Sequence, residues 1–197
     1  MNVVITGATG KIGKALAPFL RSKGAKLFLQ GSSKKEESEF EIFFVDLSTI
    51  EGIDQCIHSA SQHLGSIDLF IHLASRFEQK PFEEVTEEDW DRGFDVDLKA
   101  AFFLAQKLAP HMKRGGSLIF MSDIYAKKPY AHRLPYCIAK AGVDALTKAL
   151  ARIFKDRLRV NALALSRIDT PEEMQEVLEK IWSLATEEKG SGHLVTL

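Results

Sequence analysis

Tyr136 and Lys140 are the two side chains best placed, by type and spacing, to carry out acid–base chemistry. Residues four apart share one face of a helix, so we expect the phenol and the ammonium to lie side by side. A nearby ammonium stabilises phenolate. We therefore expect Lys140 to lower the pKa of Tyr136, so that this tyrosine exchanges a proton near neutral pH.

A glycine-rich turn near the start of the chain is suited to binding phosphate. Residues 6–13 read Thr-Gly-Ala-Thr-Gly-Lys-Ile-Gly, between a short β-branched run and a helical pattern. Glycines let the backbone approach a pyrophosphate closely, and the N–H groups of the following helix attract it. Because this turn stands at the beginning of a strand–helix series, it predicts a dinucleotide site. The predicted contacts are Gly7, Gly10, Lys11, Ile12 and Gly13.

The end of the second predicted strand indicates which dinucleotide is bound. An acid at this position bonds the ribose of NAD and repels the 2′-phosphate of NADP. Here residues 30–35 read Gln-Gly-Ser-Ser-Lys-Lys, without an acid. This segment favours NADP(H) over NAD(H), with Ser32 and Ser33 as contacts and Lys11 as further support. The alternative is that the two lysines only solvate a loop.

Strand and helix patterns alternate along the whole chain, which predicts a parallel sheet covered on both faces. We expect a single α/β domain over residues 1–197, a doubly wound Rossmann fold of about seven strands, with the ligand site at the carboxyl ends of the strands. One predicted helix runs from Thr86 to about Arg114, ended by two glycines, and another from about Tyr136 to Phe154. The predicted strands are Val3–Ile5, Leu27–Leu29, Ile42–Val45, Leu69–His72, Ser117–Met121, Val160–Leu165 and Leu194–Leu197.

Composition excludes several other classes of protein. The 197 residues carry a net charge of −1, with 45% hydrophobic and 27% charged residues. We therefore expect no nucleic-acid or membrane partner. Met1 leads directly into an apolar strand, which argues against a cleaved signal. Cys56 and Cys137 are expected to be reduced thiols in a cytoplasmic protein, and no spacing of ligand residues indicates a metal site.

Taken together, these motifs resemble the short-chain dehydrogenase/reductase family over nearly the whole chain. Residues 72–75, His-Leu-Ala-Ser, stand where the family has Asn-Asn-Ala-Gly, and residues 159–162 match the entry to its sixth strand. Residues 165–170 align with its Pro-Gly-x-Ile-x-Thr. The resemblance implies that Tyr136 and Lys140 also contact the cofactor, together with Asp46, Leu47, Ala74, Ser75, Ile168 and Thr170.

Two departures from the family pattern narrow the expected chemistry. Asp123 occupies the position of the family's catalytic serine, with Ser122 one residue too early, and Asp97 replaces a helical asparagine. An aspartate with this tyrosine–lysine pair resembles the pteridine reductase and dihydromonapterin reductase branch. A carboxylate opposes phenolate formation, so it suits reduction of a C=N bond, in which Tyr136 donates the proton and Asp123 assists. Alternatively, Asp123 only caps a loop. We expect Asp97 to order a helix or a water network without touching the substrate.

The expected substrate is small and flat, like a pterin, and Phe77, Tyr125 and Tyr130 are the candidate side chains to hold it. Two other functions remain open. One is a carbonyl reductase, acting on a ketone or 3-oxoacyl group, in which Ser122 replaces the missing serine. The other is an NADP-binding regulatory or vestigial protein, because Thr170 runs directly into the last helix without the family's substrate lid, and the chain stops before the family's usual Asp-Gly-Gly. The resemblance also implies a homodimer more than a homotetramer.

Overall fold

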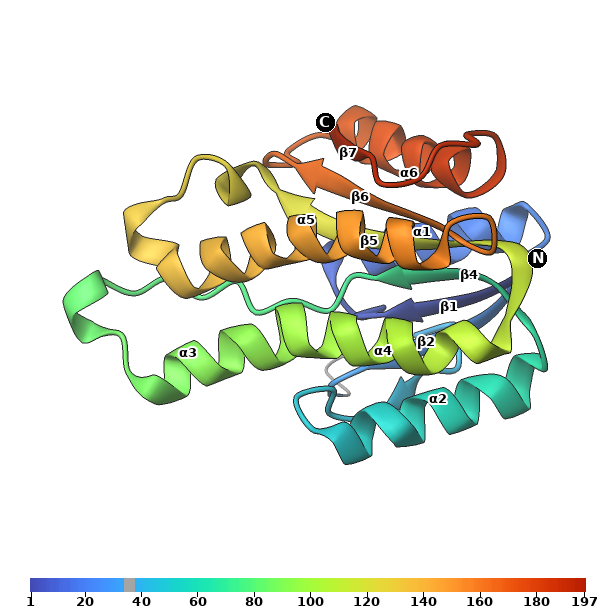
Figure 1. The fold of residues 1–197 in the computed structure, drawn as a ribbon, viewed down its shortest axis with the longest axis horizontal. Helices are drawn as coiled ribbons and strands as arrows, with labels where there is room; N and C mark the ends of the chain where they lie inside the picture. The colour runs from blue at the N-terminus through green and yellow to red at the C-terminus, as the bar shows by residue number, and fades with distance from the viewer. Residues whose placement is uncertain (34–37) are drawn as a thin grey trace.

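A seven-stranded parallel sheet, in the order β3-β2-β1-β4-β5-β6-β7, forms the centre of the molecule (Figure 1). The computed structural model describes residues 1–33 and 38–197, so Lys34 and Lys35, which supported the preference for NADP, lie outside the described residues. The predicted Rossmann fold in a single domain is confirmed. The strands are β1 (Asn2–Thr6), β2 (Lys26–Gly31), β3 (Phe43–Phe44), β4 (Ile67–His72), β5 (Met112–Asp123), β6 (Arg159–Leu165) and β7 (Leu194–Thr196).

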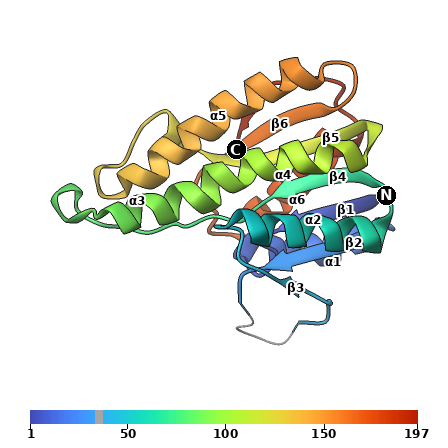
Figure 2. The same ribbon diagram turned by 60° about the horizontal axis from the view of Figure 1, so that its bottom comes forward.

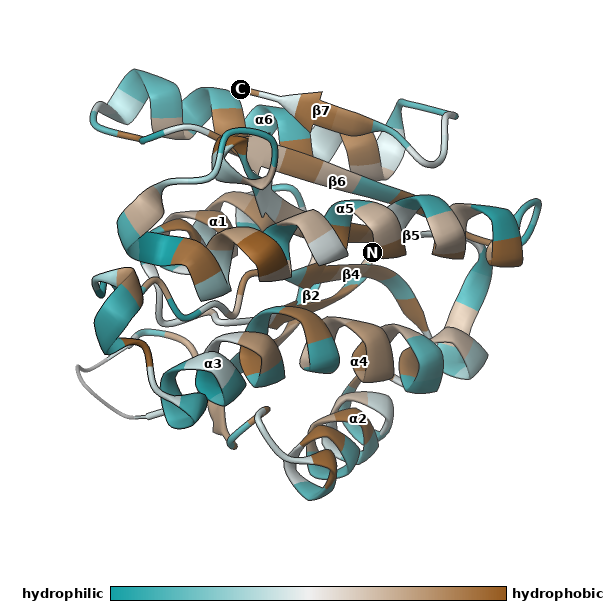
Figure 3. Ribbon diagram, turned by 60° about the vertical axis from the view of Figure 1, so that its left-hand side comes forward, coloured by the Kyte–Doolittle hydropathy of each residue, from teal (hydrophilic) through white to brown (hydrophobic). Residues whose placement is uncertain are grey.

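Helices cover both faces of the sheet because alternate strand residues point to opposite sides. In β1, Val4 belongs to the core on one face, while Val3 and Ile5 belong to the core on the other, and all three are fully buried. The first core is covered by α2 (Ile50–Leu64), α4 (Ala100–Leu108) and α5 (Leu134–Phe154). The second is covered by α1 (Lys11–Ser22) and α6 (Pro171–Thr186). Figure 3 shows the apolar residues concentrated on the strands.

The helix predicted from Thr86 to Arg114 is shorter and less regular than expected. Thr86 caps α3 (Glu87–Phe94) as predicted, in a capping box with Asp89. The α-helix ends at Leu108, and a 3-10 turn over residues 109–111 leads into β5. Pro110 in that turn lacks a backbone N–H and cannot donate the next helical hydrogen bond, which explains the early end. Gly115 lies within β5, at a φ of +83°, and does not terminate a helix.

Five residues between α3 and α4, Asp95–Lys99, form a π-helical turn. Together, α3, the π-helical turn and α4 make one continuous rod that lies beside α5 (Figure 2). π-Helical turns are rare and occur frequently at functional sites. This one carries Asp97, whose side chain is fully buried.

Strand order reverses direction between β1 and β4, which lie side by side although they are far apart in sequence. In a doubly wound sheet, the carboxyl ends of the strands at such a point bind the ligand. Thr6 and His72 are paired at these ends, and Asp123 ends β5 beside them. At the same edge, only residues 166–170 connect β6 to α6, so the structure has no inserted lid there. Among the described residues, no helix is long and apolar enough to span a bilayer.

Candidate active site

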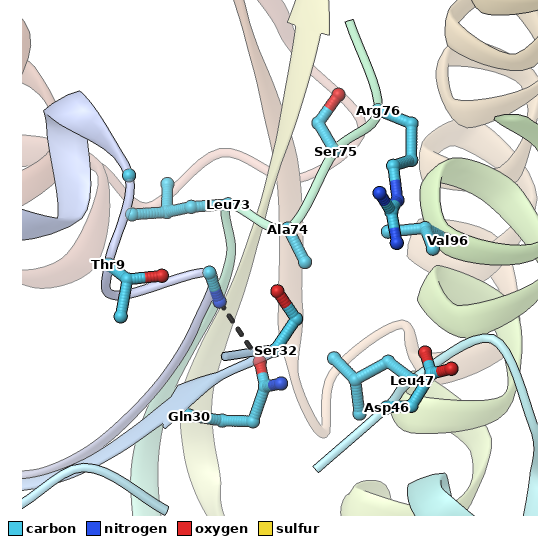
Figure 4. Close-up of a pocket in the computed structure, with 12 residues that line it drawn as sticks. Thr9, Gln30, Ser32, Asp46, Leu47, Leu73, Ala74, Ser75, Arg76 and Val96 are labelled. Atoms are coloured by element: carbon cyan, nitrogen blue, oxygen red, sulfur yellow. Dashed lines mark hydrogen bonds between the residues drawn. The ribbon is translucent and has the colours of Figure 1, made fainter. Parts of the chain in front are cut away.

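A cleft opens where β1, β2 and β4 end (Figure 4). Its walls bring together residues that the sequence predicted as cofactor contacts from four separate segments of the chain. This agreement is the basis for treating the cleft as the dinucleotide site. The predicted residues that line it are Gly7, Gly10, Ser32, Asp46, Leu47, Ala74 and Ser75.

The glycine turn is fixed by close backbone contacts that other residues would disrupt. Gly7 has a φ of +70°, and a Cβ there would lie 2.4 Å from the backbone nitrogen of Ala74. Its N–H donates to the side-chain carbonyl of Gln30, at 3.1 Å, which ties the turn to β2 (Figure 4). Gly10 is the N-cap of α1 and offers no capping side chain. The first N–H groups of α1 are therefore presented to a ligand rather than to a cap.

Several other predicted contacts lie outside the lining of this cleft. The ammonium of Lys11 donates to the backbone carbonyl of Ile168, so it links α1 to the loop after β6. The hydroxyl of Thr170 accepts from the N–H of Glu173, at 3.1 Å, and caps α6. Ile12 packs against the core, and Ser33 is exposed.

Arg76 lines the cleft and was not among the contacts predicted from the sequence. Within the described part of the chain, it is the one positively charged side chain in the lining. Its guanidinium extends into the cleft on the side where Val96 and Leu47 lie (Figure 4). The signal in the sequence was its position, directly after the Ala74-Ser75 segment that had been assigned to the cofactor.

Tyr136 and Asp123 form a hydrogen-bonded pair at the end of β5. The nearly buried Tyr136 donates from its hydroxyl to one carboxylate oxygen of Asp123, at 2.7 Å. The other oxygen of Asp123 accepts from the backbone N–H of Tyr125, at 2.8 Å. Asp123 therefore caps the turn after β5, as one of the two alternatives predicted, and also contacts the phenol.

The expected lowering of the Tyr136 pKa by Lys140 is wrong for this structure. Burial raises the pKa of Tyr136 most, and the hydrogen bond to Asp123 and the charges of Asp123 and Asp97 raise it further. The ammonium of Lys140 lies 5.4 Å from the centre of the Tyr136 ring. It bonds instead to Asp97, at 2.8 Å, and to the carbonyl of Met121, at 3.0 Å. The carboxylate of Asp97 therefore balances the positive charge of Lys140, so this charge does not stabilise a phenolate at Tyr136.

Ser122 does not take the place of the missing serine. Successive residues of a strand point to opposite faces, and Ser122 donates to Asp144 of α5, at 2.5 Å, while Asp123 faces Tyr136. The alternative in which Ser122 polarises a substrate carbonyl is therefore contradicted by its direction.

His72 is buried at the end of β4 and is neutral. Its Nε2 lies 3.1 Å from the carbonyl of Val96, which can only accept, so Nε2 carries the proton. Nδ1 then accepts from the hydroxyl of Thr6, at 2.8 Å. Burial, with a smaller effect from the Lys140 charge, lowers the pKa of His72 to about 4.

Of the three aromatic candidates, Phe77 packs directly against the ring of Tyr136. Its ring packs edge-on against Tyr136, with 4.8 Å between centroids, and it is 54% exposed. The guanidinium of Arg133 lies 3.4 Å from the centre of the Phe77 ring. Tyr125 and Tyr130 stack on each other, at 5.8 Å. A second, smaller hollow has Tyr136 and Arg133 in its walls and shares Arg76 with the dinucleotide cleft.

Comparison with known proteins identifies the family. The family model described as "short chain dehydrogenase" matches residues 1–180. The chain belongs to this family. A relative named Probable galactose dehydrogenase GalD, from Rhizobium meliloti, is 32% identical over 184 residues, which cover 86% of this chain and 72% of the relative. A hydroxynaphthalene reductase-like protein Arp2, from Metarhizium anisopliae, is 29% identical over 181 residues, 85% of this chain and 68% of the relative.

Solved structures agree with the fold of a short-chain dehydrogenase. A short-chain dehydrogenase/reductase from Serratia marcescens superposes with a TM-score of 0.88 at 23% identity, covering 100% of this chain and 94% of that one. A blue fluorescent protein from a metagenomic library, in complex with NADPH, superposes with a TM-score of 0.91 at 20% identity, covering 100% and 95%. At these identities the likeness concerns the fold alone.

The residues present fit the nicotinamide dinucleotide that short-chain dehydrogenases bind. The turn at Gly7 leaves no room for a Cβ, so backbone lines the cleft where a pyrophosphate would approach. Arg76 supplies a positive charge in the same cleft. Compared with the family pattern, the chain has acids at two positions that contact Tyr136 and Lys140, Asp123 and Asp97, and a buried imidazole at His72.

Proposed function

We propose that the chain is an NADPH-dependent reductase that adds hydrogen across a C=N bond of a small, flat, pterin-like substrate. The observation that carries the proposal is the 2.7 Å hydrogen bond between the Tyr136 hydroxyl and Asp123. Reduction of a carbonyl needs only a hydroxyl at this position. A carboxylate suits a reaction in which a nitrogen must be protonated.

The proton passes from the Tyr136 hydroxyl to the substrate nitrogen. When bound, the reduced nicotinamide supplies the hydride that reaches the neighbouring carbon. Donation would leave a phenolate 2.7 Å from the carboxylate of Asp123, and the repulsion between the two charges favours the return of a proton to Tyr136. Asp123 relays this proton from solvent to Tyr136.

Two features of the cleft support NADP(H) as the cofactor. No acid stands at residues 30–33, so a 2′-phosphate meets no negative charge from this segment. The carboxylate of Asp46 is turned to the N–H and hydroxyl of Ser48, at 2.9 and 2.8 Å. Arg76 extends toward the same side of the cleft, and we assign its positive charge to the 2′-phosphate of NADP(H) (Figure 4).

Phe77 gives the substrate a flat, partly exposed surface beside Tyr136. A pterin ring stacked there lies next to the hydroxyl that protonates it. Tyr125, whose backbone N–H bonds Asp123, stacks on Tyr130. This arrangement suits a planar heteroaromatic substrate better than a long acyl chain.

Steady-state NADPH oxidation tests the proposal. Dihydropterin and dihydrofolate are compared with a panel of ketones, using wild type, Tyr136→Phe, Asp123→Ser and Asp123→Ala. We expect reduction of the pterin substrate, its loss in Tyr136→Phe, and a strong decrease in both Asp123 variants. Ketone reduction that survives Asp123→Ala, without pterin reduction, contradicts the C=N proposal. Tight NADPH binding without turnover on any substrate contradicts both enzyme functions and supports the regulatory alternative.

A carbonyl reductase is the second candidate, and the likeness to a hydroxynaphthalene reductase-like protein favours it. In that case Asp123 replaces the family's serine by polarising the substrate through Tyr136, because Ser122 is bonded to Asp144. The same assay separates the two functions. Ketone turnover equal in wild type and Asp123→Ser identifies a carbonyl reductase.

We propose that two copies pair through the helical face formed by α4 and α5. Phe102 of α4 and Ile138 and Ile153 of α5 are exposed on these helices, at 43%, 43% and 71%. Covering them with a second copy would remove apolar surface from water. Native mass spectrometry measures the assembly, and Ile153→Glu is expected to shift a dimer to monomer.

A further inference from the structure

Asp97 makes three contacts that join the segment after β4, at Ser75 and Arg76, to Lys140 of α5. One oxygen accepts from the backbone N–H of Arg76, at 2.8 Å. The other accepts from the hydroxyl of Ser75 and forms an ion pair with the ammonium of Lys140, at 2.8 Å. Asp97 and Lys140 are 0% and 2% exposed, so solvent screens their attraction little.

The ion pair changes the charge that surrounds the phenol of Tyr136. A lone buried lysine would favour phenolate, but Lys140 is opposed by a carboxylate at hydrogen-bond distance. Tyr136 therefore faces a neutral pair from one direction and the carboxylate of Asp123 from another. Both arrangements favour the protonated phenol.

Other charged or titratable groups around Tyr136 do not reverse this balance. On its own helix, Cys137 is buried beside it. Arg133, at the N-cap of α5, stacks its guanidinium on the ring of Phe77, which packs edge-on against Tyr136. His72 of β4 is neutral and lies near the ion pair.

We propose that Asp97 is a positioning residue that neutralises Lys140 and, with Asp123, holds Tyr136 as a neutral phenol at neutral pH. This inference rests on the proposed function, in which Tyr136 is the proton donor. A phenol donates a proton in reduction, whereas oxidation of an alcohol requires a phenolate to accept one. The site is thus arranged for reduction rather than for alcohol oxidation at neutral pH.

The ionisation of Tyr136 can be followed directly, without a substrate. The chain has three tyrosines, so protein labelled with ¹³C at the tyrosine ζ-carbon gives three resonances, and the one lost in Tyr136→Phe is assigned to Tyr136. Because Asp123 also holds the phenol protonated, the titration is made in the Asp123→Ser background. Adding Asp97→Asn to this background exposes Tyr136 to the unopposed charge of Lys140. We expect its titration midpoint to fall by about one pH unit or more.

Asp144→Asn, in the same background, is the matched control. Asp144 is also a buried carboxylate, on the same helix as Lys140, but it bonds to Ser122. We expect the Tyr136 midpoint to stay unchanged in this variant. An unchanged midpoint in Asp97→Asn, or an equal fall in both variants, overturns the proposal.

A double variant keeps the test available if Asp97→Asn alone does not fold. Asp97→Asn with Lys140→Met replaces the neutral pair by two uncharged side chains. We expect the Tyr136 midpoint to remain within about half a pH unit of the background protein. The reason is that an ion pair with no net charge has been replaced by two uncharged side chains. A larger change overturns neutralisation. The titration is independent of turnover, so it can succeed or fail whatever the substrate assays give.

Discussion

The hydroxyl of Tyr136 donates to a carboxylate oxygen of Asp123 across 2.7 Å, at the carboxyl end of the sheet. This contact sets the site apart from a tyrosine activated by lysine alone. The lysine that would favour phenolate is itself paired with Asp97. The phenol therefore stays protonated, as a proton donor must be before it reacts.

Replacing Tyr136 with phenylalanine tests the donor role. Phenylalanine keeps the ring that packs against Phe77 and removes only the hydroxyl. We expect turnover to fall by about 10²- to 10⁴-fold, the usual range for a lost general acid. NADPH affinity, measured by fluorescence titration, should change little. An equal loss in NADPH affinity and turnover would indicate a binding role instead.

Arg76→Gln tests the assignment of a cation to the cofactor phosphate. Loss of a charge-assisted hydrogen bond costs about 1.5–3 kcal/mol, which corresponds to a roughly 10- to 100-fold higher dissociation constant. We expect this loss of affinity for NADPH and little change in affinity for NADH. Calorimetric titration of both cofactors measures it.

Lys11→Gln provides the comparison for Arg76. The ammonium of Lys11 is bonded to the carbonyl of Ile168 and lies outside the cleft lining. We expect nearly unchanged NADPH affinity. A larger effect at Lys11 than at Arg76 would restore the sequence-based assignment.

His72 makes stability depend on pH in a predictable direction. Its folded-state pKa, about 4, is below the ordinary value of 6.5, so the unfolded chain binds this proton first. The stabilisation is complete above pH 6.5 and is lost as the pH falls toward 4. For a fully buried group, the loss is about 3 kcal/mol.

His72→Asn should remove this contribution, because asparagine does not titrate. Urea unfolding at several pH values measures the difference between the two proteins. We expect wild type to lose about 3 kcal/mol more than the variant over this interval. Parallel pH profiles for the two proteins would show that His72 is not responsible.

Gly7→Ala tests the close approach of the turn to the segment after β4. The added Cβ would lie 2.4 Å from the Ala74 nitrogen, at a φ of +70°. Gly24 has a similar φ, +79°, but nothing lies within 4 Å of its Cβ position. Gly24→Ala should therefore cost about 1–2 kcal/mol, from backbone strain alone.

We expect Gly7→Ala to be more destabilising than Gly24→Ala and to abolish NADPH binding, which Gly24→Ala leaves intact. Thermal unfolding with and without NADPH separates the two effects. Equal stability and equal NADPH affinity in the two variants would contradict the structural role of Gly7.

The sequence alone determined the architecture of this protein and the location of its candidate cofactor cleft. Alternation of apolar strands with amphipathic helices predicts the parallel sheet, because each local pattern follows directly from side-chain periodicity. The turn at residues 6–13 and the Tyr136–Lys140 spacing are local for the same reason. A resemblance carried by these motifs predicted the family, which the comparisons confirm.

Tertiary structure decided the electrostatics of the site, because charges act between residues that are distant in sequence. No local pattern shows that Lys140 bonds Asp97, 43 positions earlier in the chain, or that Lys11 turns to Ile168. The same packing gives Asp144 the hydroxyl of Ser122 and leaves Asp123 for Tyr136. Spacing identified which side chains could react, and only their three-dimensional neighbours fixed which of them carry a proton.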